Sequence, residues 1–513
     1  MPVSPKYPGV YIEEIPSGVR TITGVSTATT AFVGRARKGP VNEPTIIHSF
    51  TEFERVFGGL WPDSTMSVAV NQYFANGGGE AVIVRVFAPL PLVVANFVQW
   101  NLPGLLGNLS IVAASPGSWA RDPDNLHIKV DTNTKGPNLY NITVQRGPDP
   151  PAPAPPPPPL EVIRNVSLVA ADPSFITTVL EQQSQYIRVG GGAMPTSLTP
   201  GTTGPVALSG NDGAGYSSAT LVPATPADRV GIYALDEADI FNLLVIPPPT
   251  ASTNVLAADW DKAATYCAKR RAMLLVDPPP AFVRPDQVAG NVPTVSSKKN
   301  AAFFYPRIKM QNPFNPDLIE EYLPGGAVAG IFARTDGDRG VWKAPAGLEA
   351  TIAGSLGLSY TMTDDQNGDL NPIAVNCLRT FPFVGQVVWG SRTMEGADAL
   401  ASEWKYIPVR RLALYIEESL YRGLKWVVFE PNDEPLWSQI RLNAGAFMNN
   451  LFRQNAFQGR SPREAYFVKC DKDTTTQNDI NLGIVNILIG FAPLKPAEFV
   501  IIKLQQMAGQ IAV

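Results

Sequence analysis

Residues 242–249 read NLLVIPPP and residues 272–280 read AMLLVDPPP, and these two similar stretches decide the fold class. Each is a short apolar run that ends in prolines, which is typical of a strand buried on both faces of a sheet. Residues 257–271 between them place apolar side chains at helical spacing and predict an amphipathic helix. A strand, a helix and a strand in this order predict a βαβ unit with parallel strands.

The N-terminal part of the chain also alternates strand and helix patterns. Residues 27–36 and 81–87 are apolar runs of strand length. Between them, residues 49–57 predict a helix with Ser49 as its N-cap, and this helix stops at Gly58. These elements predict a compact α/β unit.

The C-terminal part repeats the alternation. A helix is predicted at 409–423, and a second helix begins after Asn432 or Asp433, whose side chains suit an N-cap. Apolar runs predict strands at 425–430, 465–470, 484–491 and 497–504. The chain as a whole is therefore predicted to be a mixed α/β (α+β) protein with several domains.

Between these parts, residues 91–225 change character. Short strand-like runs at 126–130, 139–146 and 160–168 lie between turn residues and predict an antiparallel β-rich module. The stretch DPPAPAPPPPPL at 149–160 can form only a stiff polyproline segment. It is interpreted as a rigid surface loop between two hairpin strands, with a ligand for a proline-binding domain as the alternative.

Composition limits the class of protein. The chain has 513 residues, enough for two to four domains, and only 17% of them are charged, against about 25% in typical soluble domains. A surface with few charges suits burial against other subunits. The formal net charge of −4 argues against a nucleic-acid binder. The longest apolar runs, such as 482–494, are shorter than the roughly 18 residues of a membrane span, and no secretory signal is recognised.

Catalysis and cofactor binding find little support in the sequence. The only histidines are His48 and His127, and neither a GxSxG elbow nor a P-loop is present. The three cysteines are far apart, which excludes a disulfide framework or a CxxC zinc pair and favours a reducing compartment. DGDRG at 336–340 and DDQNGD at 364–369 lack EF-hand spacing and are interpreted as acidic turns. The sequence predicts no enzyme, catalytic residue, metal or cofactor.

The stretch YPGVYIEE at 7–14 raises a different question. Val10 and Ile12 would share one face of a strand, and Tyr11 and Glu13 would share the other. No second strand lies close enough in sequence to pair with it, and an isolated strand is unstable in water. This strand must pair elsewhere in its own chain or with a neighbouring molecule.

Several stretches together resemble the contractile tail sheath family. They are YPGVYIEEIPSG at 7–18, GVSTATTAFVGRARKGP at 24–40, SFTEFERVFGG at 49–59, YFANGGGEAVIVRV at 73–86, LSGNDG at 208–213, the βαβ region at 231–277, and the C-terminal runs at 410–437 and 456–506. The polyproline stretch lies outside the shared pattern.

This resemblance implies a particular domain organisation. A tube-proximal α/β domain would be built from both chain ends, 21–90 and 345–505. A β-rich outer module at 91–225 and a domain of subtilisin-like fold at 226–344 would be inserted into it. An extended arm at 1–20 and a tail at 506–513 would complete the chain.

The resemblance also implies a structural function. The subunits would form rings or a helical tube around an inner tube protein and would contract on a trigger from the baseplate; baseplate and terminator or cap proteins would be further partners. Assembly would take place in the bacterial cytoplasm, within a phage tail or an extracellular injection particle. The alternatives are a hydrolase that uses the central domain and a non-contractile proline-rich scaffold.

The resemblance implies site residues in an N-terminal arm, in a C-terminal arm and on a surface that contacts the inner tube. The implied inter-subunit strands are Val10, Tyr11, Ile12 and Glu13 near the N-terminus and Phe499, Val500, Ile501 and Ile502 near the C-terminus. Contact with the inner tube is assigned to Arg453, Arg460 and Arg463.

Overall fold

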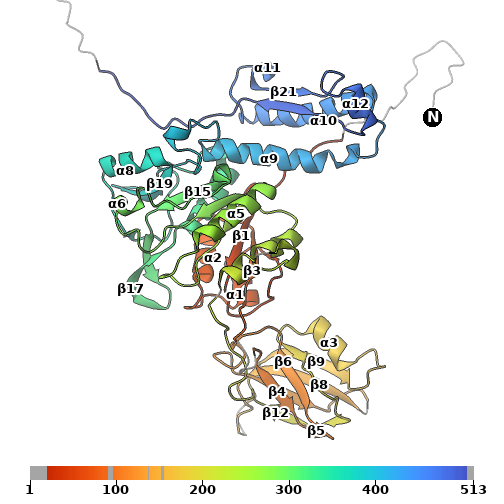
Figure 1. Cartoon of the computed structure of the whole chain (residues 1–513). Helices are drawn as coiled ribbons and strands as arrows, with labels where there is room; N and C mark the ends of the chain where they lie inside the picture. Colours follow the sequence, from red (N-terminus) through yellow and green to blue (C-terminus); the bar gives the residue numbers. More distant parts are fainter. Residues whose placement is uncertain are drawn as a thin grey trace, which may run out of the picture.

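The structure is a computed structural model, and it describes residues 20–90, 96–136, 138–151, 155–215, 217–223 and 225–504. Three parts follow one another in space (Figure 1). The central body is built around one large sheet, a β-rich module lies on one side of it, and a C-terminal layer of helices with a small sheet lies on the other. In the described part of the chain, no helix is long and apolar enough to cross a membrane.

The central body contains a mixed sheet of eight strands in the order β2-β3-β1-β13-β14-β15-β19-β20. The six inner strands are parallel, and the two edge strands, β2 and β20, run antiparallel to their neighbours. In chain order the strands are β1 (Thr30–Gly34), β2 (Thr45–Ile47), β3 (Ala81–Arg85), β13 (Leu243–Val245), β14 (Met273–Val276), β15 (Ala301–Tyr305), β19 (Val375–Phe381) and β20 (Gly385–Val388).

Helices cover both faces of this sheet. Helices α1 (Phe50–Phe57), α2 (Thr65–Ala75) and α7 (Gly325–Arg339) pack their apolar side chains on one face. Helix α5 (Ala257–Lys269) packs Trp260 and Ala263 on the other face. The predicted βαβ unit is confirmed, because β13 and β14 are parallel and buried at every residue. Smaller helices α4 (Ser218–Leu221), α6 (Pro285–Val288) and α8 (Asp364–Leu370) and the strands β16 (Ile308–Asn312), β17 (Asn315–Tyr322) and β18 (Gly357–Leu358) complete the body.

The large sheet crosses the domain boundaries that the resemblance implies at residues 225 and 345. Strand β1 pairs with β13, and β15 pairs with β19, so strands from three predicted segments share one sheet. Their side chains also share the two cores, one on each face. The observed body therefore joins parts that the sequence assigns to two domains.

The β-rich module has its own apolar core and three antiparallel sheets. Its hairpin of β8 and β9 confirms the predicted pairing, and the described polyproline residues 155–158 lie in the connection between these strands without regular secondary structure. The elements are β4 (Gln99–Leu102), β5 (Gly104–Leu105), β6 (Leu109–Ala113), β7 (Leu126–Asp131), β8 (Leu139–Arg146), β9 (Pro159–Ser167), α3 (Ile176–Gln183), β10 (Ile187–Val189), β11 (Ser197–Leu198) and β12 (Gly201–Thr203).

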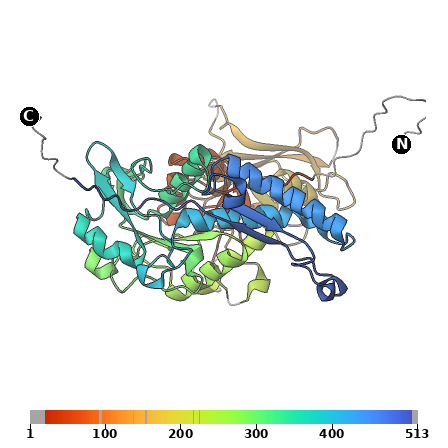
Figure 2. The ribbon, with the colours of Figure 1, turned by 90° about the horizontal axis from the view of Figure 1, so that it is seen from above.

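The C-terminal layer consists of two long helices and a two-stranded sheet (Figure 2). Its helices are α9 (Ile407–Gly423), α10 (Glu434–Arg453), α11 (Pro462–Ala465) and α12 (Gln477–Asn481), and its strands are β21 (Tyr466–Lys469) and β22 (Leu488–Phe491). Asp433 is the N-cap of α10, and its side chain accepts a hydrogen bond from the backbone of Leu436.

Two strand predictions in this layer differ from the structure. The strand predicted at 425–430 is wrong, because Lys425–Val427 forms a 3-10 turn. This segment only connects α9 to α10, which pack on each other through Leu412 and Met448, and a short connection between packed helices leaves no neighbour for a strand. Residues 497–504 have no regular secondary structure in the single chain.

Candidate assembly interface

The two-stranded sheet of the C-terminal layer has unpaired edges. Tyr466 lies opposite Phe491 in its antiparallel register. Tyr466, Val468, Ile489 and Phe491 pack on the buried residues of α9 and α10, whereas Phe467 on the other face is half exposed. Among the described residues, no third strand pairs with β21 or β22. The backbone N–H and carbonyl groups along both edges can therefore form hydrogen bonds with further strands.

An apolar groove runs beside one of these edges. It has a volume of about 620 Å³ and lies between α9 and β22. Its lining includes Ile416 and Leu420 from α9 and Ile487, Leu488 and Ile489 from the other side. A groove of this kind next to a free strand edge fits the apolar side chains of an added strand.

The end of the described chain carries a second unpartnered apolar surface. We name residues 499–504 the C-terminal arm. Its apolar side chains are 71–94% exposed: Phe499, Val500, Ile501, Ile502 and Leu504. The arm, at the dark blue end of the described chain, projects away from the rest of the ribbon (Figure 2). Consecutive exposed apolar residues are typical of a surface that another molecule covers.

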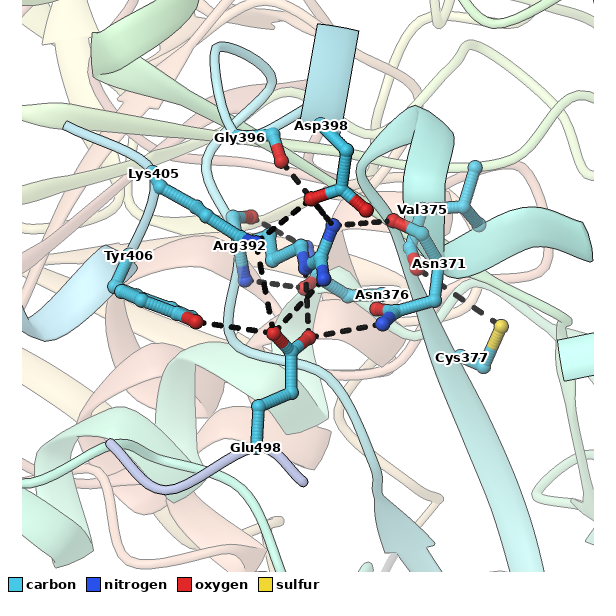
Figure 3. Close-up of polar contacts among 10 residues, drawn as sticks. All are labelled: Asn371, Val375, Asn376, Cys377, Arg392, Gly396, Asp398, Lys405, Tyr406 and Glu498. Atoms are coloured by element: carbon cyan, nitrogen blue, oxygen red, sulfur yellow. Dashed lines mark hydrogen bonds and ion pairs between the residues drawn. The ribbon is translucent and has the colours of Figure 1, made fainter. Parts of the chain in front are cut away.

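The residue just before this arm is firmly held. The carboxylate of Glu498 accepts hydrogen bonds from Arg392 Nε at 2.7 Å and Nη2 at 2.8 Å, from Asn371 Nδ2 at 2.9 Å and from Tyr406 Oη at 3.0 Å (Figure 3). Lys405 Nζ lies 3.8 Å from the same carboxylate. This bidentate arrangement with an arginine is among the stronger polar contacts that proteins make.

Burial and hydrogen bonding compete in this cluster. Burial alone would raise the pKa of Glu498, but the hydrogen bonds from Arg392 and Asn371 outweigh it and hold the pKa below its usual value. Burial, with the Glu498 charge as a further cause, raises the pKa of Tyr406 to about 12. Glu498 is therefore charged and Tyr406 is neutral at physiological pH.

The residues that the sequence predicts for assembly have different outcomes. Val10, Tyr11, Ile12 and Glu13 lie outside the described residues. Phe499, Val500, Ile501 and Ile502 are exposed and have no regular secondary structure, so their role as an inter-subunit strand stays a prediction. The side chains of Arg453, Arg460 and Arg463 are exposed and form no ion pair within the described part of the chain. Arg392 and Glu498 were not predicted, since they are 106 residues apart and no motif connects them.

The weak catalytic and metal candidates lie in structural positions. The side chain of His48 is 62% exposed and lies 3.8 Å from Glu80. Asp336 of the first acidic stretch is paired with Arg411, and Asp364 of the second begins α8 after the capping residue Thr363. Within the ranges that the structure describes, no group of three or more His, Cys, Asp or Glu side chains is placed to hold a metal ion.

The fold and this surface define a class of protein. The described molecule presents unpaired strand edges, an apolar groove and an exposed apolar segment, which are features of a subunit that connects to others. Comparison with known proteins identifies the class more closely. A family model described as the phage tail sheath C-terminal domain matches residues 401–506.

Curated relatives agree with that match. The chain is 30% identical over 127 residues to the tail sheath protein of Vibrio phage KVP40, which is 25% of this chain and 18% of the phage protein. It is 24% identical over 280 residues to a putative prophage major tail sheath protein of Pseudomonas aeruginosa strain UCBPP-PA14, which is 53% of this chain and 67% of that protein. The chain thus matches less than two thirds of the length of the phage relative.

Solved structures extend the similarity over the whole chain. The cryo-EM structure of the anti-feeding prophage (AFP) baseplate matches 98% of this chain and 100% of its own, with 25% identity and a TM-score of 0.58. The AFP helical sheath in its contracted state covers the same shares, with 24% identity and a TM-score of 0.57. By sequence at residues 401–506 and by fold along almost its whole length, the chain groups with the contractile tail sheath proteins.

Proposed function

We propose that this chain is a sheath subunit that polymerises, as rings or a helical tube, around an inner tube protein. On a trigger from a baseplate, the subunits would repack into a shorter and wider lattice and drive the inner tube through a target envelope. The similarity to a contracted AFP sheath supports this function. Many small differences in contact energy, one per subunit, would add up to the work of contraction.

The connection between subunits is the exchange of arms. The observation that carries it is that one chain offers both an exposed apolar arm and an unpaired sheet edge with an apolar groove. Phe499 and Ile501 would point to one face of a strand, and Val500 and Ile502 to the other. Because both faces are apolar, this strand needs cover on both sides. The helix layer under the sheet would cover one face, and a neighbouring subunit would have to cover the other.

The N-terminal arm would make the second connection. Arg20, where the described chain begins, is held on α10 by a hydrogen bond from its backbone N–H to Asn443 Oδ1 at 3.1 Å, and its guanidinium stacks on Trp426. Residues 7–15 before it would add a strand to a neighbouring subunit through Val10, Tyr11, Ile12 and Glu13. Exchange of both arms would keep the lattice connected while other contacts change.

The remaining partners follow from the same function. The exposed guanidinium groups of Arg453, Arg460 and Arg463 would contact the inner tube protein. Baseplate and terminator or cap proteins would bind the two ends of the polymer. Assembly in the bacterial cytoplasm would produce a phage tail or an extracellular injection particle.

Deletion of the arms tests this function. We expect purified full-length chain to form tubes that are visible by electron microscopy. A variant without residues 1–15 and a variant without residues 499–513 should stay folded monomers by circular dichroism and size-exclusion chromatography. Tubes of normal length from either deletion variant would contradict the exchange of that arm.

A further inference from the structure

The exchange of arms does not explain how the C-terminal arm is attached to its own subunit, and the cluster around Glu498 lies at that attachment. We propose that Glu498 is the fixed point from which the C-terminal arm leaves its own subunit, and that Arg392 is the residue that positions it. This inference rests on the proposed arm exchange. In addition, the arm is fastened at Glu498, and a pull on the arm reaches the central body through Arg392.

The first argument is that hydrogen bonding to the body and exposure both change between Glu498 and Phe499. Glu498 is tied to the body by four hydrogen bonds between 2.7 and 3.0 Å. The next residue, Phe499, is 71% exposed, and the residues up to Leu504 are also exposed. Among the described residues, Glu498 is the last one along the chain whose side chain hydrogen-bonds to the body. Six extended residues reach at most about 20 Å, so the position of Glu498 decides which surfaces the described arm can touch.

The second argument is the rigidity of the residue that holds Glu498. The side chain of Arg392 is 1% exposed. Its backbone N–H donates to Asn376 Oδ1 at 2.7 Å, and Asn376 Nδ2 donates to the carbonyl groups of Arg392 at 2.8 Å and Phe303 at 3.1 Å. Asn376 belongs to β19 and Phe303 to β15, two neighbouring strands of the large sheet. A pull on the arm would therefore reach the sheet through the side chain of Arg392 and the side-chain amide of Asn376.

The third argument is that Glu498 is not needed to neutralise Arg392. Arg392 Nη1 also binds Asp398 Oδ1 at 3.0 Å and the carbonyl groups of Asn371 at 2.9 Å and Gly396 at 3.3 Å. Two carboxylates therefore face one guanidinium, and only one of them belongs to the segment that leads into the arm (Figure 3). This second carboxylate makes it possible to separate fastening of the arm from stability of the arginine.

The experiment compares single-residue variants by the lowest protein concentration that gives tubes, measured by sedimentation and electron microscopy. Glu498→Ala removes the fastening and should raise this concentration about tenfold or more, the effect expected from losing charge-assisted hydrogen bonds. The monomer should still unfold cooperatively, because Glu498 lies at the edge of the fold. Glu498→Gln keeps the shape of the side chain and should show a smaller rise in the same direction, which provides a second variant if the alanine variant does not fold.

Two matched controls remove charges next to the fastening. Asp398→Ala removes the other carboxylate from Arg392, and Lys495→Ala removes an exposed charge from the same segment of chain. Both controls should form tubes within about twofold of the wild-type concentration. Proteolysis of the monomer between residues 494 and 498 should accelerate in Glu498→Ala and stay unchanged in both controls.

The deletion of residues 499–513 separates failure of this inference from failure of the proposed function. If the deletion abolishes tubes but both Glu498 variants form them at the wild-type concentration, the fastening is overturned and arm exchange stands. If Asp398→Ala raises the concentration as much as Glu498→Ala, neutralisation of Arg392 is the cause, and the fastening is again overturned. If the deletion variant forms normal tubes, arm exchange and the fastening fail together.

Discussion

Arg411 on α9 and Asp336 on α7 form a buried ion pair that connects the C-terminal layer to the central body. The two hydrogen bonds are 2.8 Å and 2.5 Å long, and the side chains are only 3% and 4% exposed. Arg411 Nη2 also donates to the carbonyl of Thr27 at 2.9 Å, so three distant parts of the chain meet at one guanidinium. Any motion of the layer relative to the body would have to break these contacts.

Removal of Arg411 should therefore destabilise the monomer strongly. Arg411→Met keeps most of the apolar stem but leaves Asp336 buried without its partner. We expect a loss of about 3–5 kcal/mol in the free energy of unfolding, measured with urea. The exposed pair Arg339–Glu349 provides the control, and Glu349→Ala should cost less than about 1 kcal/mol. A loss below about 1 kcal/mol for Arg411→Met would show that the buried pair does not hold the layer.

Close packing of α2 against α7 gives a second prediction. A Cβ atom on Gly326 would collide with the backbone of Ala69, which a small shift of side chains cannot relieve. Gly326→Ala should reduce the free energy of unfolding by about 1–3 kcal/mol because the helices must separate. Gly337 lies in the same helix with open space around it, so Gly337→Ala should be neutral or stabilise by up to about 1 kcal/mol. Equal effects of both substitutions in thermal or urea unfolding would contradict this explanation.

The elements that sequence reasoning predicted correctly are those with a local signal. The apolar runs at β13 and β14 and the Ser49 and Asp433 caps could be read without knowledge of the fold. The order of the strands in the large sheet could not be predicted from the sequence. Strand β1 lies between β3 and β13, and strands that are apolar on both faces contain no pattern that selects their neighbours.

The candidate interface was predictable only in part. The apolar run at 499–502 was visible in the sequence, but the fastening at Glu498 depends on Arg392, which approaches it only in the folded chain. The segment at 425–430 shows the opposite failure. Its β-branched and aromatic residues favour a strand, but its position between two packed helices decides the structure.

Asp277 gives a prediction about pH. Its Oδ1 accepts a hydrogen bond of 2.7 Å from the backbone N–H of Gly325 at the start of α7. Burial raises the pKa of Asp277 to about 7, against the opposing effect of this hydrogen bond. Between about pH 4 and pH 7, the folded chain thus keeps a proton that the unfolded chain has lost. The contribution of Asp277 to stability is therefore highest below pH 4 and falls as the pH rises to about 7.

Asp277→Asn should remove this pH dependence while it keeps an oxygen for Gly325. The free energy of unfolding of the variant, relative to wild type, should rise from pH 4 to pH 7 by up to about 4 kcal/mol and then level off. Urea unfolding at pH 4, 5, 6, 7 and 8 measures the difference. Parallel curves for the two proteins over this range would show that folding leaves the pKa of Asp277 close to its ordinary value.

The groove beside β22 gives the last prediction. Leu488 lies on β22, lines the groove and is 53% exposed. Leu488→Lys places a charge where an added strand would bury its apolar side chains, so tubes should form only at a concentration about tenfold higher or more. The free energy of unfolding of the monomer should change by less than about 0.5 kcal/mol, because an exposed residue is replaced.

Leu482→Lys is the matched control, since Leu482 is 65% exposed at the end of α12 and does not line the groove. It adds the same charge to the same layer and should leave the concentration for tube formation within about twofold of wild type. Sedimentation of both variants over a dilution series distinguishes an effect of the groove from an effect of net charge. If both variants form tubes at the same concentration, the added strand does not bind in the groove, because Leu488 lines the groove and Leu482 does not.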